Sequence, residues 1–96
     1  MPASRSVVLT SAGISTLRLH PLTKVQHIIL WHLVETLPPA GEVLSVTNLG
    51  ETLAIGRVQA LRAMKTLLAA RFILRGPRMG VPYHYRLNPA LFRVLS

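Results

Sequence analysis

Two segments with helical spacing of apolar residues lie only a few residues apart in the second half of this chain. Ser45 is a favourable N-cap for the first segment, which we expect to end near Ala54. A second helix is expected to begin at residue 56 or 57 and to reach Arg71. Only a tight turn fits between them, so the pattern predicts two consecutive short helices. The apolar residues that share one face of the first helix are Val46, Leu49 and Leu53.

The second of these helices has one apolar face and one basic face. The residues expected to point into the core are Ala60, Met64, Leu67 and Leu68, with Leu61 beside them. The opposite face is left to Val58, Gln59, Arg62, Lys65, Thr66 and Ala69. The helix is therefore predicted to bury one side and to present cationic side chains to solvent on the other.

A β-hairpin is predicted directly after this helix. Phe72–Arg75 is typical of a strand, residues 76–80 of a loop, and Val81–Leu87 of a returning strand. Alternation along the returning strand puts Tyr83 and Tyr85 on one face. We expect both tyrosines to lie in the core, the alternative being that they stack on nucleic-acid bases.

The first half of the chain is predicted to contribute a strand and a longer helix. Ser6–Thr10 is a short β-prone run, residues 11–13 are turn-like, and residues 14–20 fit no single element. Thr23 is a favourable N-cap for a helix over Lys24–Leu37.

The apolar residues of helix 24–37 cover more than one side of the cylinder, which predicts burial by the core and by a partner. Residues 89–96 are expected to form a final helical turn whose apolar side needs a cover. We therefore expect a homodimer through residues 24–37, with residues 89–96 as a second candidate contact and with two reading helices in successive major grooves.

The formal charge of +8 is unevenly distributed along the chain. Residues 1–51 carry three basic and three acidic side chains, whereas residues 52–96 carry eight basic and no acidic ones. Such a segment creates a positive field suited to a polyanion, the alternative being a merely solubilising surface. We expect one surface to collect these cations, which are Arg57, Arg62, Lys65, Arg71, Arg75, Arg78, Arg86 and Arg93.

Catalysis and metal binding find no support in the sequence. The chain has no cysteine, which excludes disulfides, thiolate zinc sites and thiol catalysis. It has no aspartate, its three glutamates lie far apart, and its four histidines lack acidic partners at metal-ligand spacing. We expect no enzyme activity, no metal and no cofactor.

No membrane or export segment is predicted. The most apolar stretch, Val25–Val34, is much shorter than the roughly 20 residues that span a bilayer. The first residues lack the long apolar run and cleavage site of a secretory signal. We therefore expect a cytoplasmic protein that does not enter a membrane.

Residues 45–87 resemble the winged helix-turn-helix family. Leu49 stands where the family has its inward leucine, Gly50 where the two helices cross, and Ile55 at the buried turn position. The core positions of the recognition helix and the start of the wing match Ala60, Met64, Leu67 and Phe72–Ile73.

Three positions depart from the pattern of that family. The turn usually has glycine where Ala54 stands, and a serine or threonine cap where Gly56 stands. Arg71 replaces a glycine that commonly closes the recognition helix. Spacing and apolar periodicity are nevertheless kept throughout the segment.

This resemblance implies an α+β fold of the winged helix-turn-helix type, with a three-helix core, a β-hairpin wing and a short N-terminal strand. It implies one domain over residues 1–96, of which residues 1–5 are expected to be flexible. It also implies that the partner is double-stranded DNA, because an α-helix fits the major groove.

The implied DNA-binding residues fall on the recognition helix, about residues 56–71, and on the wing, residues 75–81. Gln59 and Arg62 are the candidates for base edges, where a bidentate pair contributes roughly 1 to 3 kcal/mol of discrimination. The candidates for phosphate and wing contacts are Arg57, Lys65 and Thr66 on the helix, with Val58 beside them, and Arg75 and Arg78 in the wing.

The biological role stays open between transcriptional regulation and plasmid or phage maintenance, either partition or replication. The end of the wing, from Tyr85 to Phe92, is similar to that of the plasmid replication and partition group. The alternatives are a winged helix that binds only protein and an RNA-binding module.

Overall fold

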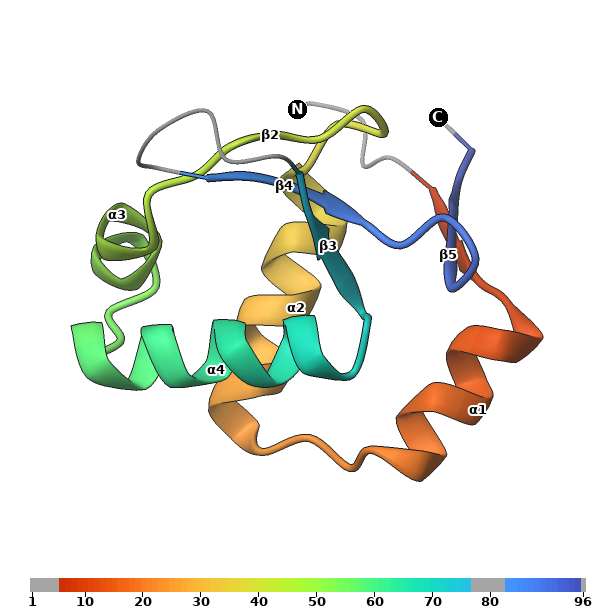
Figure 1. Ribbon diagram of the computed structural model, residues 1–96, viewed down its shortest axis with the longest axis horizontal. Coiled ribbons are helices and arrows are strands. Elements are labelled where there is room, and N and C mark those ends of the chain that lie inside the picture. The colour runs from red at the N-terminus through yellow and green to blue at the C-terminus, as the bar shows by residue number, and fades with distance from the viewer. Residues whose placement is uncertain (1–5, 77–82, 96) are drawn as a thin grey trace.

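The computed structural model describes residues 6–76 and 83–95 and has an α+β fold with small antiparallel sheets (Figure 1). The strand β1 is followed by two helices, a very short strand, two more helices and three strands. The elements are β1 (Val7–Leu9), α1 (Ser11–Leu19), α2 (Lys24–Thr36), β2 (Glu42–Val43), α3 (Val46–Thr52), α4 (Arg57–Ala69), β3 (Ile73–Arg75), β4 (His84–Leu87) and β5 (Phe92–Val94).

Helix starts lie where the capping residues predict them. The Thr23 hydroxyl accepts a hydrogen bond from the Gln26 backbone N–H, and the Gln26 side chain accepts one from the Thr23 N–H in return. The Ser45 hydroxyl caps α3 by accepting from the Asn48 N–H. At Gly56 no side chain caps α4, as the departure from the family pattern predicts.

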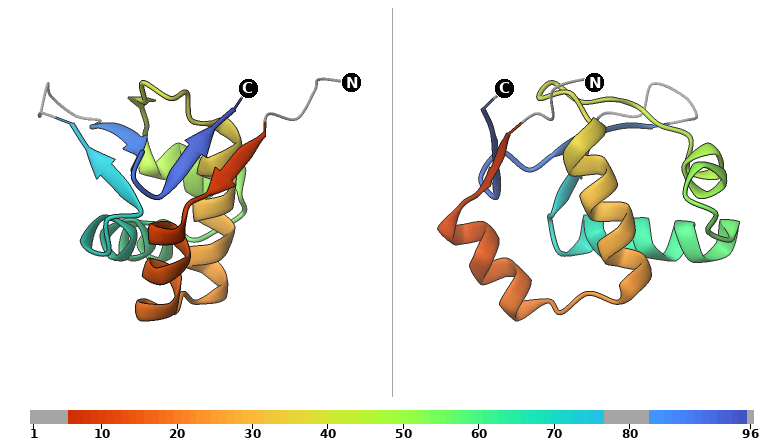
Figure 2. Two further views of the ribbon diagram at one scale, coloured as in Figure 1. Left: turned by 90° about the vertical axis from the view of Figure 1, so that its right-hand side faces the viewer. Right: turned by 180° about the vertical axis from the view of Figure 1, so that it is seen from behind.

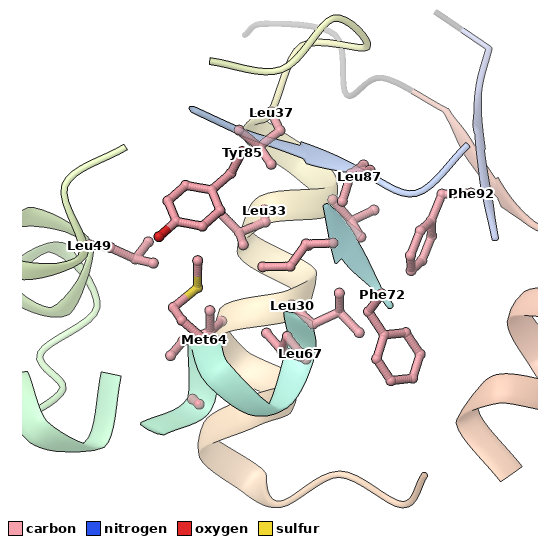
Figure 3. Close-up of a cluster of buried hydrophobic side chains, with 14 of the residues drawn as sticks. Leu30, Leu33, Leu37, Leu49, Met64, Leu67, Phe72, Tyr85, Leu87 and Phe92 are labelled. Atoms are coloured by element: carbon pink, nitrogen blue, oxygen red, sulfur yellow. The ribbon is translucent and has the colours of Figure 1, made fainter. Parts of the chain in front are cut away.

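The core lies between α2, α4 and the strands that follow α4 (Figure 3). Leu30 and Leu33 on the inner face of α2 and Leu67 on α4 are almost fully buried. Phe72 and Ile73 close the cluster at the start of the hairpin segment. Each such side chain contributes roughly 1.5 to 3 kcal/mol by leaving water, so this cluster holds α4 in place.

The three-stranded sheet has the order β2-β4-β3, and both pairs are antiparallel. Tyr85 and Leu87 on β4 point into the core, whereas Arg86 between them is exposed. The strand pair predicted after the helix that is now α4 is therefore present as β3 and β4. Residues 77–82, including Val81, lie outside the described residues. Tyr83 is half-buried and packs against the core.

Glycine is required where α3 and α4 meet. A Cβ at Gly50 would lie 2.9 Å from the Ile55 carbonyl oxygen and 3.4 Å from the Ala60 Cβ.

Ala54 and Arg71 stand at two positions where the family pattern has glycine. Both residues adopt positive φ angles, of 56° and 63°. An L-residue in this conformation costs roughly 1 to 2 kcal/mol, so both turns are strained.

Residues 11–13 were expected to be turn-like and residues 14–20 to fit no single element, but residues 11–19 form the helix α1. Its N-cap residue Thr10 accepts a hydrogen bond from the Gly13 N–H. Gly13 is buried, and a Cβ there would lie 2.5 Å from the Leu91 carbonyl oxygen. The local signal is weak because this glycine, which disfavours a helix, is demanded by a close approach to a segment distant in sequence.

Residues 89–96 were expected to form a helical turn, and this expectation is wrong for the strand β5 within them. Only residues 89–91 form a turn, and β5 then pairs antiparallel with β1, Val7 opposite Val94 and Leu9 opposite Phe92. The Thr10 hydroxyl adds a bond to the Ala90 carbonyl. The edge of β1 supplies partners that a local pattern cannot reveal.

Smaller differences occur elsewhere. The strand β2, which was not among the expected elements, pairs with β4. Leu68 is half-buried rather than fully inward, and Ala63, which was not among the expected core residues, is 2% exposed. Within residues 6–76 and 83–95, no helix has both the length and the hydropathy to cross a membrane.

Candidate nucleic-acid interface

The outer face of α4 carries all six side chains that the sequence singles out on this helix. Arg57, Val58, Gln59, Arg62, Lys65 and Thr66 are each exposed. Their exposure follows from the burial of Ala60, Ala63, Met64 and Leu67 on the opposite face. The Thr66 hydroxyl donates to the Arg62 carbonyl oxygen at 3.2 Å, so its proton is already engaged within the helix.

One flank of α4 borders an open cavity of about 360 Å³. Arg57 and Lys65 line it from the helix, and Arg75 lines it from β3. Its floor is apolar and is contributed by Leu44, Val46, Leu61, Met64, Leu68 and Tyr85. Figure 2 shows α4 and β3 on the same side of the molecule, with α2 and β1 on the other. The tertiary fold thus brings together three candidates that are up to 18 residues apart in sequence.

Arg75 is held at the rim by an aromatic ring. Its guanidinium carbon lies 4.3 Å from the centroid of the Tyr83 ring, which is a cation–π contact. Tyr83 in turn contacts Tyr85 edge to face. Sequence reasoning did not assign this role to Tyr83. The register of the hairpin could have indicated this contact. Arg75 pairs with Tyr85, which makes Tyr83 the diagonal neighbour of Arg75 on the same face of the sheet.

The opposite flank of α4 carries the two candidates for base edges. Gln59 and Arg62 line a second, shallower hollow of about 210 Å³ together with Thr23 and Gln26 at the start of α2. Val58, 58% exposed, stands between the two flanks. The candidates therefore divide into a hairpin-side group and an α2-side group, a division the sequence pattern did not reveal.

The electrostatic character of this surface is positive. No acidic side chain is among the described residues that line either hollow. Burial raises the pKa of the Tyr85 hydroxyl, and the nearby Arg75 cation opposes that shift only in part. The Tyr85 hydroxyl is therefore uncharged at neutral pH and leaves the positive potential intact.

Not all cations of the second half lie on this surface. Arg86 points to the other face of the sheet from Tyr85, near Gly41. Arg93 lies on β5, opposite Val8 of β1. The expectation that one surface collects every cation is therefore wrong for these two, because strand alternation and the β1–β5 pair direct them elsewhere. Arg78 lies outside the described residues.

Metal-ligating side chains do not gather in the part of the chain that the structure describes: it contains no cluster of three histidine, aspartate or glutamate residues. The chain matches no protein-family model and no curated protein sequence.

Proposed function

We propose that this chain is a winged helix-turn-helix protein that binds double-stranded DNA through α4 and the β3–β4 hairpin. The observation that carries the proposal is the cluster of Arg57, Lys65 and Arg75 around one hollow with no carboxylate among its described lining residues. Two of these cations come from the exposed helix and one from the hairpin. Such an arrangement matches a phosphate backbone that passes between a helix and a wing.

We infer different roles in DNA binding for the two flanks of α4. On the hairpin side, Arg57, Lys65 and Arg75 neutralise phosphates and position the duplex. On the outer and α2-facing sides, Gln59 and Arg62 read base edges in the major groove. Arg78 in the wing adds a contact to the backbone or the minor groove. Val58 and Thr66 form part of the exposed surface of α4 beside these residues.

The turn geometry supports the family likeness that underlies this proposal. Ala54 and Arg71 adopt the left-handed conformation that the family accommodates with glycine. Gly50 makes the close approach to Ile55 expected at a helix crossing. These three positions are set by backbone geometry and are independent of the charges on α4.

The direct test compares two double variants that remove the same charge. Arg57→Ala/Arg75→Ala removes hairpin-side cations, and Arg86→Ala/Arg93→Ala removes two cations that lie off the proposed surface. Fluorescence anisotropy with a mixed-sequence DNA duplex would measure both. The slope of log affinity against log salt is negative, and we expect the first pair to reduce its magnitude by about 1.8, since each phosphate contact contributes about 0.9. The second pair should leave the slope close to that of the unchanged protein.

Equal losses in the two variants would show that net charge alone drives binding and would overturn the proposal. The same titration with a structured RNA separates the RNA-binding alternative, which predicts tighter binding to RNA than to duplex DNA. A protein-interaction winged helix would show no salt-dependent binding to either nucleic acid.

The biological role that we propose is transcriptional regulation or plasmid or phage maintenance, in the cytoplasm. Footprinting distinguishes them. Protection of one palindrome near a promoter favours regulation, whereas cooperative coating of an array of direct repeats favours partition or replication.

A further inference from the structure

The outward side of α2 carries a narrow stripe of four residues that are partly exposed in the protomer. Lys24, Ile28, Trp31 and Glu35 follow one another at intervals of four, three and four residues. The buried residues of the helix, Ile29, Leu30, Leu33 and Val34, lie on its other side. Intervals of four and three are those of the contact positions in a pair of packed helices.

The two central residues of the stripe are apolar, and the indole ring of Trp31 is held in place by its neighbours. Ile28 is 39% exposed and Trp31 is 38% exposed. The Trp31 indole N–H donates to His27 Nδ1 at 3.2 Å, and Phe92 contacts the indole edge to face. Because its one polar atom is already bonded, the exposed part of the indole ring can be covered by an apolar partner without losing a hydrogen bond.

The two outer residues of the stripe have opposite charges. Lys24 is at the start of α2 and Glu35 is near its end, and both are exposed. Neither side chain forms an ion pair with any residue in the described ranges. An antiparallel second copy of α2 would bring Lys24 to Glu35 and Ile28 to Trp31, because both pairs are centred on the same point between Ile29 and Leu30. A parallel copy would instead place like charges together.

We propose that the protein forms a two-fold symmetric dimer in which this stripe packs antiparallel against the same stripe of a second copy. The surface is self-complementary, as an isologous interface requires. Four side chains per protomer make a contact below the standard size for stable complexes, so we expect a dissociation constant in the micromolar range. The proposed contact is formed by α2 alone; of the apolar side chains that follow β4, Leu91 and Phe92 are buried within the protomer and Leu95 is exposed.

This arrangement has a consequence for DNA that rests on the proposed function. α2 lies at the back of the protomer and α4 at the front in Figure 1, and Figure 2 shows α2 foremost when the molecule is seen from behind. A two-fold axis at the outward side of α2 turns the two α4 surfaces away from each other. The dimer would therefore hold two separate duplex segments rather than successive major grooves of one.

Charge reversal tests the dimer without any DNA. Lys24→Glu and Glu35→Lys each replace two attractive contacts by two repulsive ones, whereas the double variant restores attraction with the signs exchanged. Sedimentation equilibrium should show about tenfold weaker association for each single variant and near-original association for the double variant. Both reversals put the charge that the helix dipole favours at its end of α2, so weaker association would not reflect a less stable helix.

Ile28→Glu serves as the severe variant, expected to leave a folded monomer by circular dichroism. A wild-type protein that stays monomeric up to about a millimolar overturns the proposal. So do single reversals without effect, or a double variant as weak as the singles, which would exclude the antiparallel register. Duplex DNA binding of the wild-type protein separates the two hypotheses, because a wild-type protein that is monomeric and still binds DNA refutes the dimer and leaves the proposed function standing.

Discussion

The guanidinium of Arg75 lies over the ring of Tyr83, with the guanidinium carbon 4.3 Å from the ring centroid. Arginine side chains lose conformational freedom when they bind a phosphate, and this contact orients the group before any ligand arrives. The hairpin cation is therefore positioned at the rim of the hollow that Arg57 and Lys65 line from α4.

Substitutions at Tyr83 should change DNA affinity through Arg75. We expect Tyr83→Leu to weaken binding to a DNA duplex severalfold, since a cation–π contact at an exposed site contributes about 0.5 to 1 kcal/mol. Tyr83→Phe keeps the ring and is the matched control, expected to bind as the unchanged protein does. Anisotropy titrations measure both, and equal affinity for the two variants would contradict a positioning role for the ring.

Arg62 and Arg57 should affect specificity differently. Arg62→Ala is expected to relax the preference at one base pair by roughly 1 to 3 kcal/mol. Arg57→Ala should weaken binding to all sequences alike and reduce the magnitude of the slope of log affinity against log salt by about 0.9. Selection from a random duplex library, followed by affinity measurements on the selected site and its single-base variants, distinguishes these effects. If Arg62→Ala leaves the selected sequence unchanged, Arg62 does not read a base.

The strained turns predict stabilising substitutions. Ala54→Gly and Arg71→Gly should each raise the free energy of unfolding by about 1 kcal/mol, because glycine adopts positive φ without a clash. The gain is smaller than the full strain, since glycine also costs more backbone entropy on folding. Urea unfolding followed by circular dichroism provides the measurement. Ala69→Gly, in the regular last turn of α4, is the control and should destabilise.

Gly50→Ala should destabilise the chain. The added methyl group would lie 2.9 Å from the Ile55 carbonyl oxygen, which is backbone and cannot move aside cheaply. We expect a loss of about 1 to 3 kcal/mol, the usual cost of overpacking. Thermal unfolding measures it, and a melting temperature equal to that of the unchanged protein would mean that α3 and α4 do not approach as closely as described.

Alkaline pH should weaken the fold through Tyr85. Burial raises the pKa of this hydroxyl above its ordinary value of about 10. The folded state then holds the proton more tightly than the unfolded state, so the stabilisation is complete below pH 10 or so and is lost as the pH rises through the raised value. Tyr85→Phe should flatten that part of the curve of unfolding free energy against pH. Tyr83→Phe should change it less, because it removes only the smallest of the causes that shift the pKa of Tyr85 and keeps the burial of that hydroxyl. An identical alkaline slope in Tyr85→Phe would show that this titration is not coupled to folding.

The sequence alone was sufficient for the elements whose signals are local. Thr23 and Ser45 mark the starts of α2 and α3 because each hydroxyl bonds to a backbone N–H three residues later. The apolar spacing of α4 predicts which of its sides is buried, and the missing cap at Gly56 follows from the residue itself. In these cases every interacting group lies within one or two helical turns.

The tertiary structure decided everything that depends on distant partners. Residues 92–94 become a strand because β1, about 85 residues earlier, offers an edge to pair with, and Gly13 sits in α1 because the Leu91 carbonyl passes close to it. Likewise, the hairpin register brings Arg75 beside Tyr83 and groups it with two cations of α4, while strand alternation sends Arg86 elsewhere. Local periodicity records which side of an element is apolar, but only packing determines which neighbour each exposed side chain meets.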